Sequence, residues 1–219
     1  MPDSVKQELL DIRQDMLSPD SYPIWHPPSL PDMASMDILV VDASRYGYGF
    51  HFRSYSMPNS VTEASRVWGP GGAPKLPTGA HDQFSAEVKG MVLAVREVLR
   101  LHPPEGRPKV PLLIVSDCQA IPRCMAKAYT HHPALMDFIM DTSPYKDMLY
   151  CTWWLGGDHM PADVCSRAGR VHTRTTTLSQ RFASYVEAAR QWGHAQGYLC
   201  LRWMSIMFGG ARLSQCQDS

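Results

Sequence analysis

The sequence has no excess of charge of either sign, because its 219 residues include 21 lysines and arginines and 21 aspartates and glutamates. Proteins that hold nucleic acid through many phosphates usually carry a basic excess. Composition therefore gives no support to a nucleic-acid partner, and any basic surface must be local. The hydrophobic fraction of 44% predicts a packed core and excludes wholesale disorder.

Long apolar runs are also missing. No stretch approaches the roughly 18 apolar residues that a membrane-spanning helix needs. The N-terminal segment MPDSVKQELLDIRQDM is charged and lacks the apolar centre of a signal peptide. We therefore expect an intracellular protein, in the cytoplasm or the nucleus, with no membrane partner.

Paired cysteines are the third absence. The six cysteines stand at positions 118, 124, 151, 165, 200 and 216, and none forms a C-x-x-C pair. A chain of this length does not need a disulfide framework, so we expect reduced thiols. The adjacent His131 and His132 have no cysteine or further histidine at zinc-finger spacing. The spacing therefore argues against a structural zinc site.

Three parts are predicted along the chain. Residues 1–35 combine an N-terminal amphipathic helix over 4–17 with a proline-rich connector, LSPDSYPIWHPPSLPDM, in which proline prevents a helix or a central strand. Residues 36–168 hold the folded domain. Residues 169–219 are expected to form a C-terminal helical extension, in which LSQRFASYVEAARQWG is predicted to be a helix.

The pattern of the middle part begins with strands and continues with alternating helices and strands. MDILVVDAS is typical of a buried strand, and RYGYGFHFRSYS and VTEASRVWG follow as antiparallel partners. After them come a helix over 81–101, the strand VPLLIVSD, one or two helices, the strand DMLYCTWWL and the short helix PADVCSRAG. This order predicts an α/β fold whose mixed sheet is flanked by helices.

Four carboxylates occupy special places in this pattern. Asp42 and Asp117 close two buried strands, and functional groups gather where such strands end. Glu87 lies at the border of the apolar stripe of the helix over 81–101, and Asp163 opens the short helix PADVCSRAG. Each residue alone is as well explained as a turn former, a helix cap or a solvated side chain. The functional interpretation of the four carboxylates therefore rests on their joint pattern.

Four carboxylates near one edge of a sheet repel each other unless a cation lies among them. Mg²⁺ prefers oxygen ligands and combines a few carboxylates with water and substrate phosphate oxygens. Two such ions, about 3.5–4 Å apart, can activate a water and stabilise a departing 3′ oxygen. The spacing therefore favours metal-dependent cleavage of a phosphodiester.

Four segments together resemble the ribonuclease H domain of reverse-transcribing retroelements, of the long-terminal-repeat or tyrosine-recombinase type. VVDASRYGYGF is similar to that family's first strand and hairpin, and FSAEVKGMVLAVREVL to its first helix. LLIVSDCQA resembles the strand that delivers the third acid, and WWLGGDHMPADVCSR ends in the A-D-x-x-S-R motif of the fourth. The resemblance covers about residues 36–168, with the motifs in the same order.

The resemblance implies a ribonuclease H-like fold with a five-stranded mixed sheet. It also implies cleavage of the RNA strand of an RNA–DNA hybrid, which leaves a 3′-hydroxyl and a 5′-phosphate. Asp42 would bridge two Mg²⁺ or Mn²⁺ ions, Asp163 would complete the site that activates water, and Glu87 and Asp117 would serve the metal beside the leaving group. An upstream reverse transcriptase domain of the same polyprotein would be the partner in the chain.

Two further residues are candidates for contact with the substrate. Ser44, beside Asp42, is placed to touch a phosphate or a sugar hydroxyl. His159 stands where the family usually has asparagine, in a loop where relatives often have a mobile histidine that assists catalysis or product release. A histidine satisfied within its loop is the simpler interpretation. Cys118 follows Asp117 where many relatives have asparagine, which bears on fine positioning and removes no ligand.

Two alternatives stay open at this point. A non-catalytic ribonuclease H-fold module would bind nucleic acid or protein, since a fold does not guarantee an activity; such modules normally lose one or more of the acids. An integrase or transposase nuclease would share the fold, but those relatives usually place the last acid as a glutamate on a longer helix.

Overall fold

The computed structural model describes residues 7, 32–72, 75–76, 82–101, 110–127, 131–141, 149–153 and 160–195. By its contacts the chain divides into two units, Met1–Leu30 and Pro31–Ser219, and every described residue except Gln7 belongs to the second. Of the predicted N-terminal helix only Gln7 is described, and it is helical; the proline-rich connector up to residue 31 and the chain beyond 195 lie outside the described residues.

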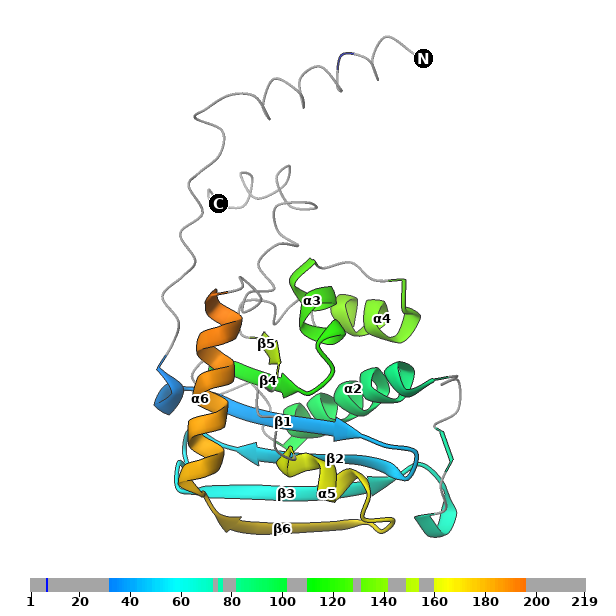
Figure 1. The fold of residues 1–219 in the computed structure, drawn as a ribbon, viewed down its shortest axis with the longest axis horizontal. Coiled ribbons are helices and arrows are strands. Elements are labelled where there is room, and N and C mark those ends of the chain that lie inside the picture. The colour runs from blue at the N-terminus through cyan, green and yellow to red at the C-terminus, as the bar shows by residue number, and fades with distance from the viewer. Residues whose placement is uncertain are drawn as a thin grey trace, which may run out of the picture. The chain divides into compact units, whose positions relative to one another are not determined.

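The second unit is built on one mixed sheet (Figure 1). Its strands are β1 (Asp37–Ala43), β2 (Gly47–Arg53), β3 (Ser60–Val67), β4 (Leu112–Ser116), β5 (Leu149–Trp153) and β6 (His172–Thr177). They lie in the order β5-β4-β1-β2-β3-β6. The first three strands pair antiparallel, and β4 and β5 continue parallel to β1. The α/β class and the mixed sheet are confirmed, but the sheet has six strands and the predicted number of five was wrong.

The additional strand is β6, which pairs antiparallel with β3 from Ser60 opposite Thr177 to Ser65 opposite His172. Its sequence HTRTTT is mostly exposed and lacks the apolar alternation that marks a half-buried strand. β-Branched threonine is the strand-favouring signal it does carry. The sheet therefore continues past residue 168, where the sequence pattern predicted the domain to end.

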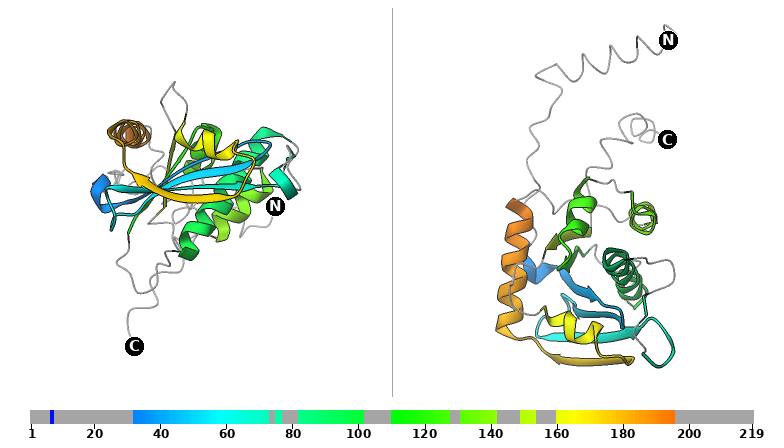
Figure 2. Two further views of the ribbon diagram at one scale, coloured as in Figure 1. Left: turned by 90° about the horizontal axis from the view of Figure 1, so that it is seen from below. Right: turned by 45° about the vertical axis from the view of Figure 1, so that its right-hand side comes forward.

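Helices cover both faces of the sheet. They are α2 (Gln83–Leu101), α3 (Ala120–Lys127), α4 (Pro133–Asp141), α5 (Pro161–Ser166) and α6 (Gln180–Ala195). In Figures 1 and 2, α2 lies on one face and α5 and α6 lie on the other. α2 contacts β1 and β2, α5 contacts β1, β2 and β3, and α6 contacts β5 and β4. The helix predicted within LSQRFASYVEAARQWG is confirmed as part of α6.

The main hydrophobic core fills the space between the sheet and the helices α2, α3 and α4. Leu39 and Ile114 of the central strands meet Met91 and Val95 of α2, and Phe138 of α4 joins them. All five side chains are fully buried. Burial of a large apolar side chain contributes about 1.5–3 kcal/mol, so this layer fixes α2 firmly against β1.

Two glycines set the distance between the sheet and the helices that bear acids. A Cβ at Gly90 of α2 would lie 2.8 Å from the Cβ of Ala43, and a Cβ at Gly49 of β2 would lie 2.4 Å from the Cβ of Cys165 in α5. Both approaches are closer than ordinary side-chain contacts. The glycines of VVDASRYGYGF therefore include one that lets α5 lie directly on the sheet.

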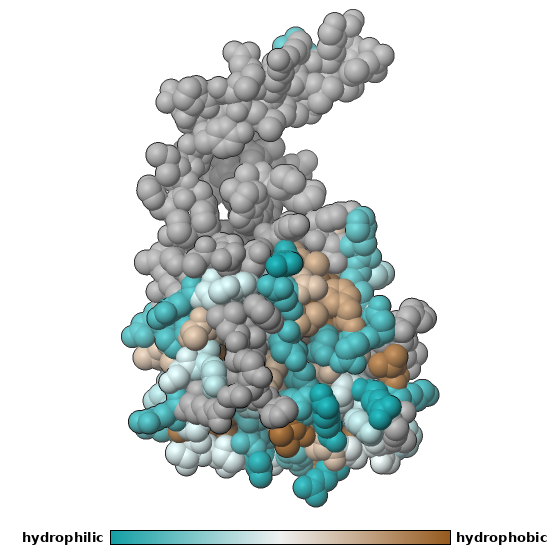
Figure 3. Space-filling view, in the orientation of Figure 1, coloured by the Kyte–Doolittle hydropathy of each residue, from teal (hydrophilic) through white to brown (hydrophobic). Residues whose placement is uncertain are grey.

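The surface in Figure 3 is mainly hydrophilic over the described residues, with brown areas interrupted by teal and white ones. Four large apolar side chains stand out as exposed, Met57, Leu101, Val164 and Val171. Within the described ranges, no helix has both the length and the apolar character needed to cross a membrane.

Candidate metal centre

Two of the four predicted acids meet because their strands are neighbours in parallel register. Val41 of β1 lies opposite Ser116 of β4, so that the next residues, Asp42 and Asp117, come side by side at the carboxyl end of the strand pair. The turn after β4 is held by the Cys118 N–H, which donates to Ser116 Oγ at 3.1 Å. Strand register alone therefore brings these two carboxylates together.

The third acid reaches the same place from α2. Glu87 is buried, and its Oε2 accepts a hydrogen bond of 3.0 Å from the Ala43 N–H. Gln83, one turn earlier, donates from Nε2 to Glu87 Oε1 at 2.6 Å and to the Ala43 carbonyl at 2.7 Å. Two donors thus fix the carboxylate at the end of β1, beside Asp42.

Asp42, Glu87 and Asp117 form the group that we call the acidic trio. One carboxylate oxygen from each lies within 4.8 Å of the others. Asp42 and Glu87 are buried and Asp117 is exposed, so one side of the group faces solvent. An oxygen-only donor set with an open side is what Mg²⁺ or Mn²⁺ requires, because these ions keep water or substrate oxygens in part of their shell. The chemistry of the trio fits a hard divalent cation.

Burial and the charges of neighbouring acids raise the pKa values of all three carboxyls of the trio. Burial raises the pKa of Asp42 from 3.8 to about 7, with the charges of Asp117 and Asp163 adding to the rise. Burial also raises the pKa of Glu87 from 4.5 to about 9, and again Asp42 and Asp117 add to it. The pKa of Asp117 is raised as well, by the partial desolvation of its carboxylate and by the charge of Asp163. Like charges held this close disfavour ionisation unless positive charge enters the group.

Asp163, the fourth predicted acid, lies close to the trio but outside it. Its charge raises the pKa of both Asp42 and Asp117, which places it within electrostatic range of both. Its Oδ1 forms an ion pair of 2.7 Å with the Arg167 guanidinium. The structure therefore brings three of the acids together and sets the fourth beside them on α5.

Hydrogen bonds from two serines join α5 to β1. Ser166 at the end of α5 donates its hydroxyl to Asp42 Oδ2 and lies 3.0 Å from the Asp163 carbonyl. Ser44, directly after β1, donates to the Ser166 carbonyl at 2.8 Å and accepts from the Tyr46 N–H at 3.1 Å. Both serines are buried. These bonds orient Asp42 and hold the helix of Asp163 against the strand of Asp42.

The structure tests neither of the two predicted substrate contacts. The Ser44 hydroxyl is engaged within the fold, so its contact with a phosphate or a sugar stays a prediction. His159 lies outside the described residues.

Sequence reasoning missed two residues that orient the trio. Gln83 lies four residues before Glu87 on α2, a spacing at which helical side chains meet, so the helical pattern held the signal. Ser166 is the serine of A-D-x-x-S-R, but its bond to Asp42 spans 124 positions of the chain and depends on the tertiary fold.

Neither a family model nor a curated protein sequence matches the chain.

Proposed function

We propose that this protein is a metal-dependent endonuclease of ribonuclease H type, which hydrolyses the RNA strand of RNA–DNA hybrids. The observation that carries the proposal is the acidic trio, in which carboxylates from β1, α2 and the end of β4 converge on one open position. The motif resemblance of residues 36–168 supplies the substrate class, and the convergence supplies the metal chemistry.

The trio suits this reaction because its carboxylates, when ionised, hold negative charge that a divalent cation would neutralise. Mg²⁺ or Mn²⁺ ions held there would supply a polarised water and stabilisation of the leaving oxygen. The side chains of the protein orient the metal ligands. Ser166 and Gln83 orient Asp42 and Glu87, and Arg167 holds Asp163 beside the trio. In this proposal Asp42, at the centre of these contacts, would be among the residues that hold the metal.

The motif resemblance is the basis for proposing that the RNA strand is cut. The same resemblance is the basis for proposing a reverse transcriptase domain as the partner. Hybrid duplexes are recognised through backbone shape and the 2′-hydroxyl more than through base edges. An upstream reverse transcriptase domain of the same polyprotein would deliver such hybrids, with the proline-rich segment before residue 36 as its link.

The test is cleavage of a hybrid whose RNA strand is labelled, by the full chain with Mg²⁺, with Mn²⁺ and with chelator. We expect metal-dependent cuts in the RNA of the hybrid, no cuts with chelator, and a loss of activity of at least a hundredfold in Asp42→Asn. Asparagine keeps an oxygen for the Ser166 hydroxyl, so this variant should remain folded. The matched control is Asp137→Asn, an exposed aspartate of α4, which should cut like the parent protein.

Equal cleavage by Asp42→Asn and the parent protein would sink the proposal. A chain that neither cuts the hybrid nor takes up Mn²⁺ through Asp42 would be the non-catalytic module instead. Uptake of Mn²⁺ by the parent protein, compared with Asp42→Asn, separates these two outcomes.

A further inference from the structure

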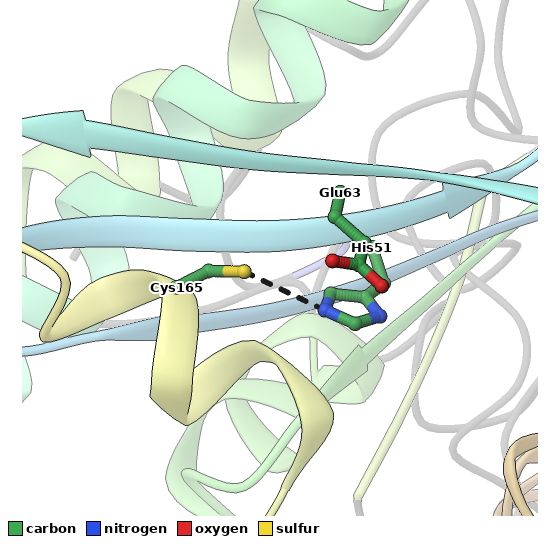
Figure 4. A group of neighbouring side chains, drawn as sticks. All are labelled: His51, Glu63 and Cys165. Carbon is green, nitrogen blue, oxygen red and sulfur yellow. Dashed lines mark hydrogen bonds between the residues drawn. The ribbon is translucent and has the colours of Figure 1, made fainter. Parts of the chain in front are cut away.

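A second cluster of ligating side chains lies on the same face of the sheet as α5, and the acidic trio does not use it. His51 of β2 and Glu63 of β3 are paired opposite each other in the sheet, and Cys165 of α5 lies against them. One ligand atom from each lies within 4.8 Å of the others. Figure 4 shows the Cys165 sulfur directed at the His51 ring, with the Glu63 carboxylate beside that ring.

The donor set differs in kind from that of the trio. A thiol, an imidazole and one carboxylate are the ligands of a borderline ion such as Zn²⁺, whereas Mg²⁺ avoids sulfur and nitrogen. We propose that His51, Glu63 and Cys165 form a structural site for a zinc-like divalent metal ion, which fixes α5 to the sheet.

The spacing of the two strongest ligands fits tetrahedral coordination. Cys165 Sγ lies 3.6 Å from His51 Nε2. Zinc bonds of about 2.3 Å to sulfur and about 2.0–2.1 Å to nitrogen, at a tetrahedral angle, place the two atoms about 3.5 Å apart. An ion therefore fits between them with little movement of either side chain.

The surroundings also suit a metal. Cys165 is 3% exposed and His51 is 9% exposed. Phe182 of α6 stacks on the His51 ring, with ring centroids 6.1 Å apart, and covers it with an apolar side chain. Burial lowers the pKa of His51, which keeps its imidazole neutral as a ligand must be. An apolar cover of this kind controls the access of water to a metal centre.

Glu63 is the ligand that already has partners. Its Oε1 accepts from the Thr176 hydroxyl at 2.9 Å, and its Oε2 pairs with Arg174 at 2.6 Å. The Arg174 side chain is 66% exposed on the edge strand β6, and ion pairs this exposed contribute little to stability. Metal binding would replace Arg174 at Oε2, while the Thr176 hydroxyl would keep the carboxylate oriented.

Metal binding also requires the Cys165 thiol to lose its proton. Burial raises the pKa of the Cys165 thiol to about 11, so the metal displaces the proton from sulfur. The S–H bond breaks, a sulfur–metal bond forms and the proton passes to the buffer, with no change of oxidation state. A molecule of water or a group from outside the cluster would complete the fourth position.

The test is titration of the reduced, metal-free full chain with Co²⁺, a spectroscopic substitute for Zn²⁺. We expect a sulfur-to-cobalt charge-transfer band that saturates at one ion per chain and is abolished by one equivalent of Zn²⁺. Cys165→Ser should remove the band and weaken Zn²⁺ binding at least tenfold. Cys124→Ser, a matched change on α3, should leave both unchanged, since Cys124 packs against the main hydrophobic core and is not a member of the cluster.

Two further variants complete the test, Glu63→Gln and Asp42→Asn. Glu63→Gln keeps an oxygen for the Thr176 hydroxyl, so it should fold and yet bind Zn²⁺ several-fold more weakly. Asp42→Asn should keep the band, because the trio contains no sulfur. Because the band does not depend on Asp42, a failure of the zinc-site proposal can be told apart from a failure of the nuclease proposal. No thiolate band, or a band that survives in Cys165→Ser, would overturn the site.

Discussion

At the scale of single residues, the candidate metal centre depends on donors that hold its acids in place. Asp42 and Glu87 are buried carboxylates, and each has a specific neutral partner, the Ser166 hydroxyl for one and the Gln83 amide for the other. Hydrogen bonds to the charged form lower the pKa of a carboxyl, so both partners oppose the rise that burial causes. The donors therefore favour the ionised form that binds a cation.

Ser166→Ala tests this role. We expect the affinity for Mn²⁺ to fall about 10- to 100-fold, the range in which residues that orient metal ligands act, and the hydrolysis rate to fall with it at limiting metal. Isothermal titration with Mn²⁺ measures the first effect directly. Raising the metal concentration should recover most of the activity, because the ligands themselves remain.

The control is Ser65→Ala, which removes an equally buried hydroxyl that donates to the Arg170 carbonyl at 2.8 Å. Both variants lose a buried hydroxyl and the hydrogen bonding it provides, at a cost of about 1–3 kcal/mol. If the two variants bind Mn²⁺ equally well, Ser166 has only a structural role.

At the scale of elements, the distance of α5 from the sheet decides where Ser166 and Asp163 lie. The six-residue helix α5 buries Ala162, Cys165 and Ser166 against the strands and exposes Val164. Gly49 makes this approach possible, because a Cβ there would lie 2.4 Å from the backbone nitrogen of Ser166. A side chain on β2 would therefore push on the residue that holds Asp42.

Gly49→Ala should lower the free energy of unfolding by about 1–3 kcal/mol, the usual cost of overfilling a packed region, and should weaken Mn²⁺ binding as well. Chemical denaturation and metal titration measure the two effects. Gly69→Ala is the matched control, since a Cβ at Gly69 meets nothing within 4 Å. Equal stability of the two variants would show that α5 does not depend on this contact.

The elements also show what the sequence reveals and what it hides. The meeting of Asp42 and Asp117 was predictable, because apolar strands of recognisable pattern end at these residues. β6 was not predictable, since its sequence HTRTTT is polar and shows no apolar alternation. The cluster at His51 and Cys165 was hidden for another reason, as 114 positions separate the two residues and no spacing rule connects them.

At the scale of the whole molecule, the raised pKa values couple stability to pH. In the metal-free protein, folded Asp42 keeps its proton up to about pH 7 and folded Glu87 up to about pH 9, whereas the unfolded chain releases both near pH 4. The unfolded state therefore binds fewer protons across this range, and the folded state loses stability as the pH rises from about 4 to about 9. A divalent cation that neutralises the trio removes this loss.

Thermal unfolding at several pH values measures the coupling. With chelator, the melting temperature should fall between pH 5 and pH 9. With free Mg²⁺ at 100 times its Kd, we expect a gain of roughly 5–10 °C at pH 8 and a much smaller gain at pH 5, where protons compete for the carboxylates. Asp42→Asn should make the melting temperature depend less on pH, both with chelator and with Mg²⁺. A melting temperature that rises with pH in chelator would contradict the burial of ionisable groups in the trio.

The wide separation of the four acids along the chain has a consequence for protein synthesis. Residues 42, 87 and 117 leave the ribosome well before residues 163 and 166. A nascent chain that stops before α5 holds the trio but lacks the hydroxyl that steadies Asp42 and the carboxylate beside it. The candidate metal centre therefore gains these two groups only when α5 has emerged.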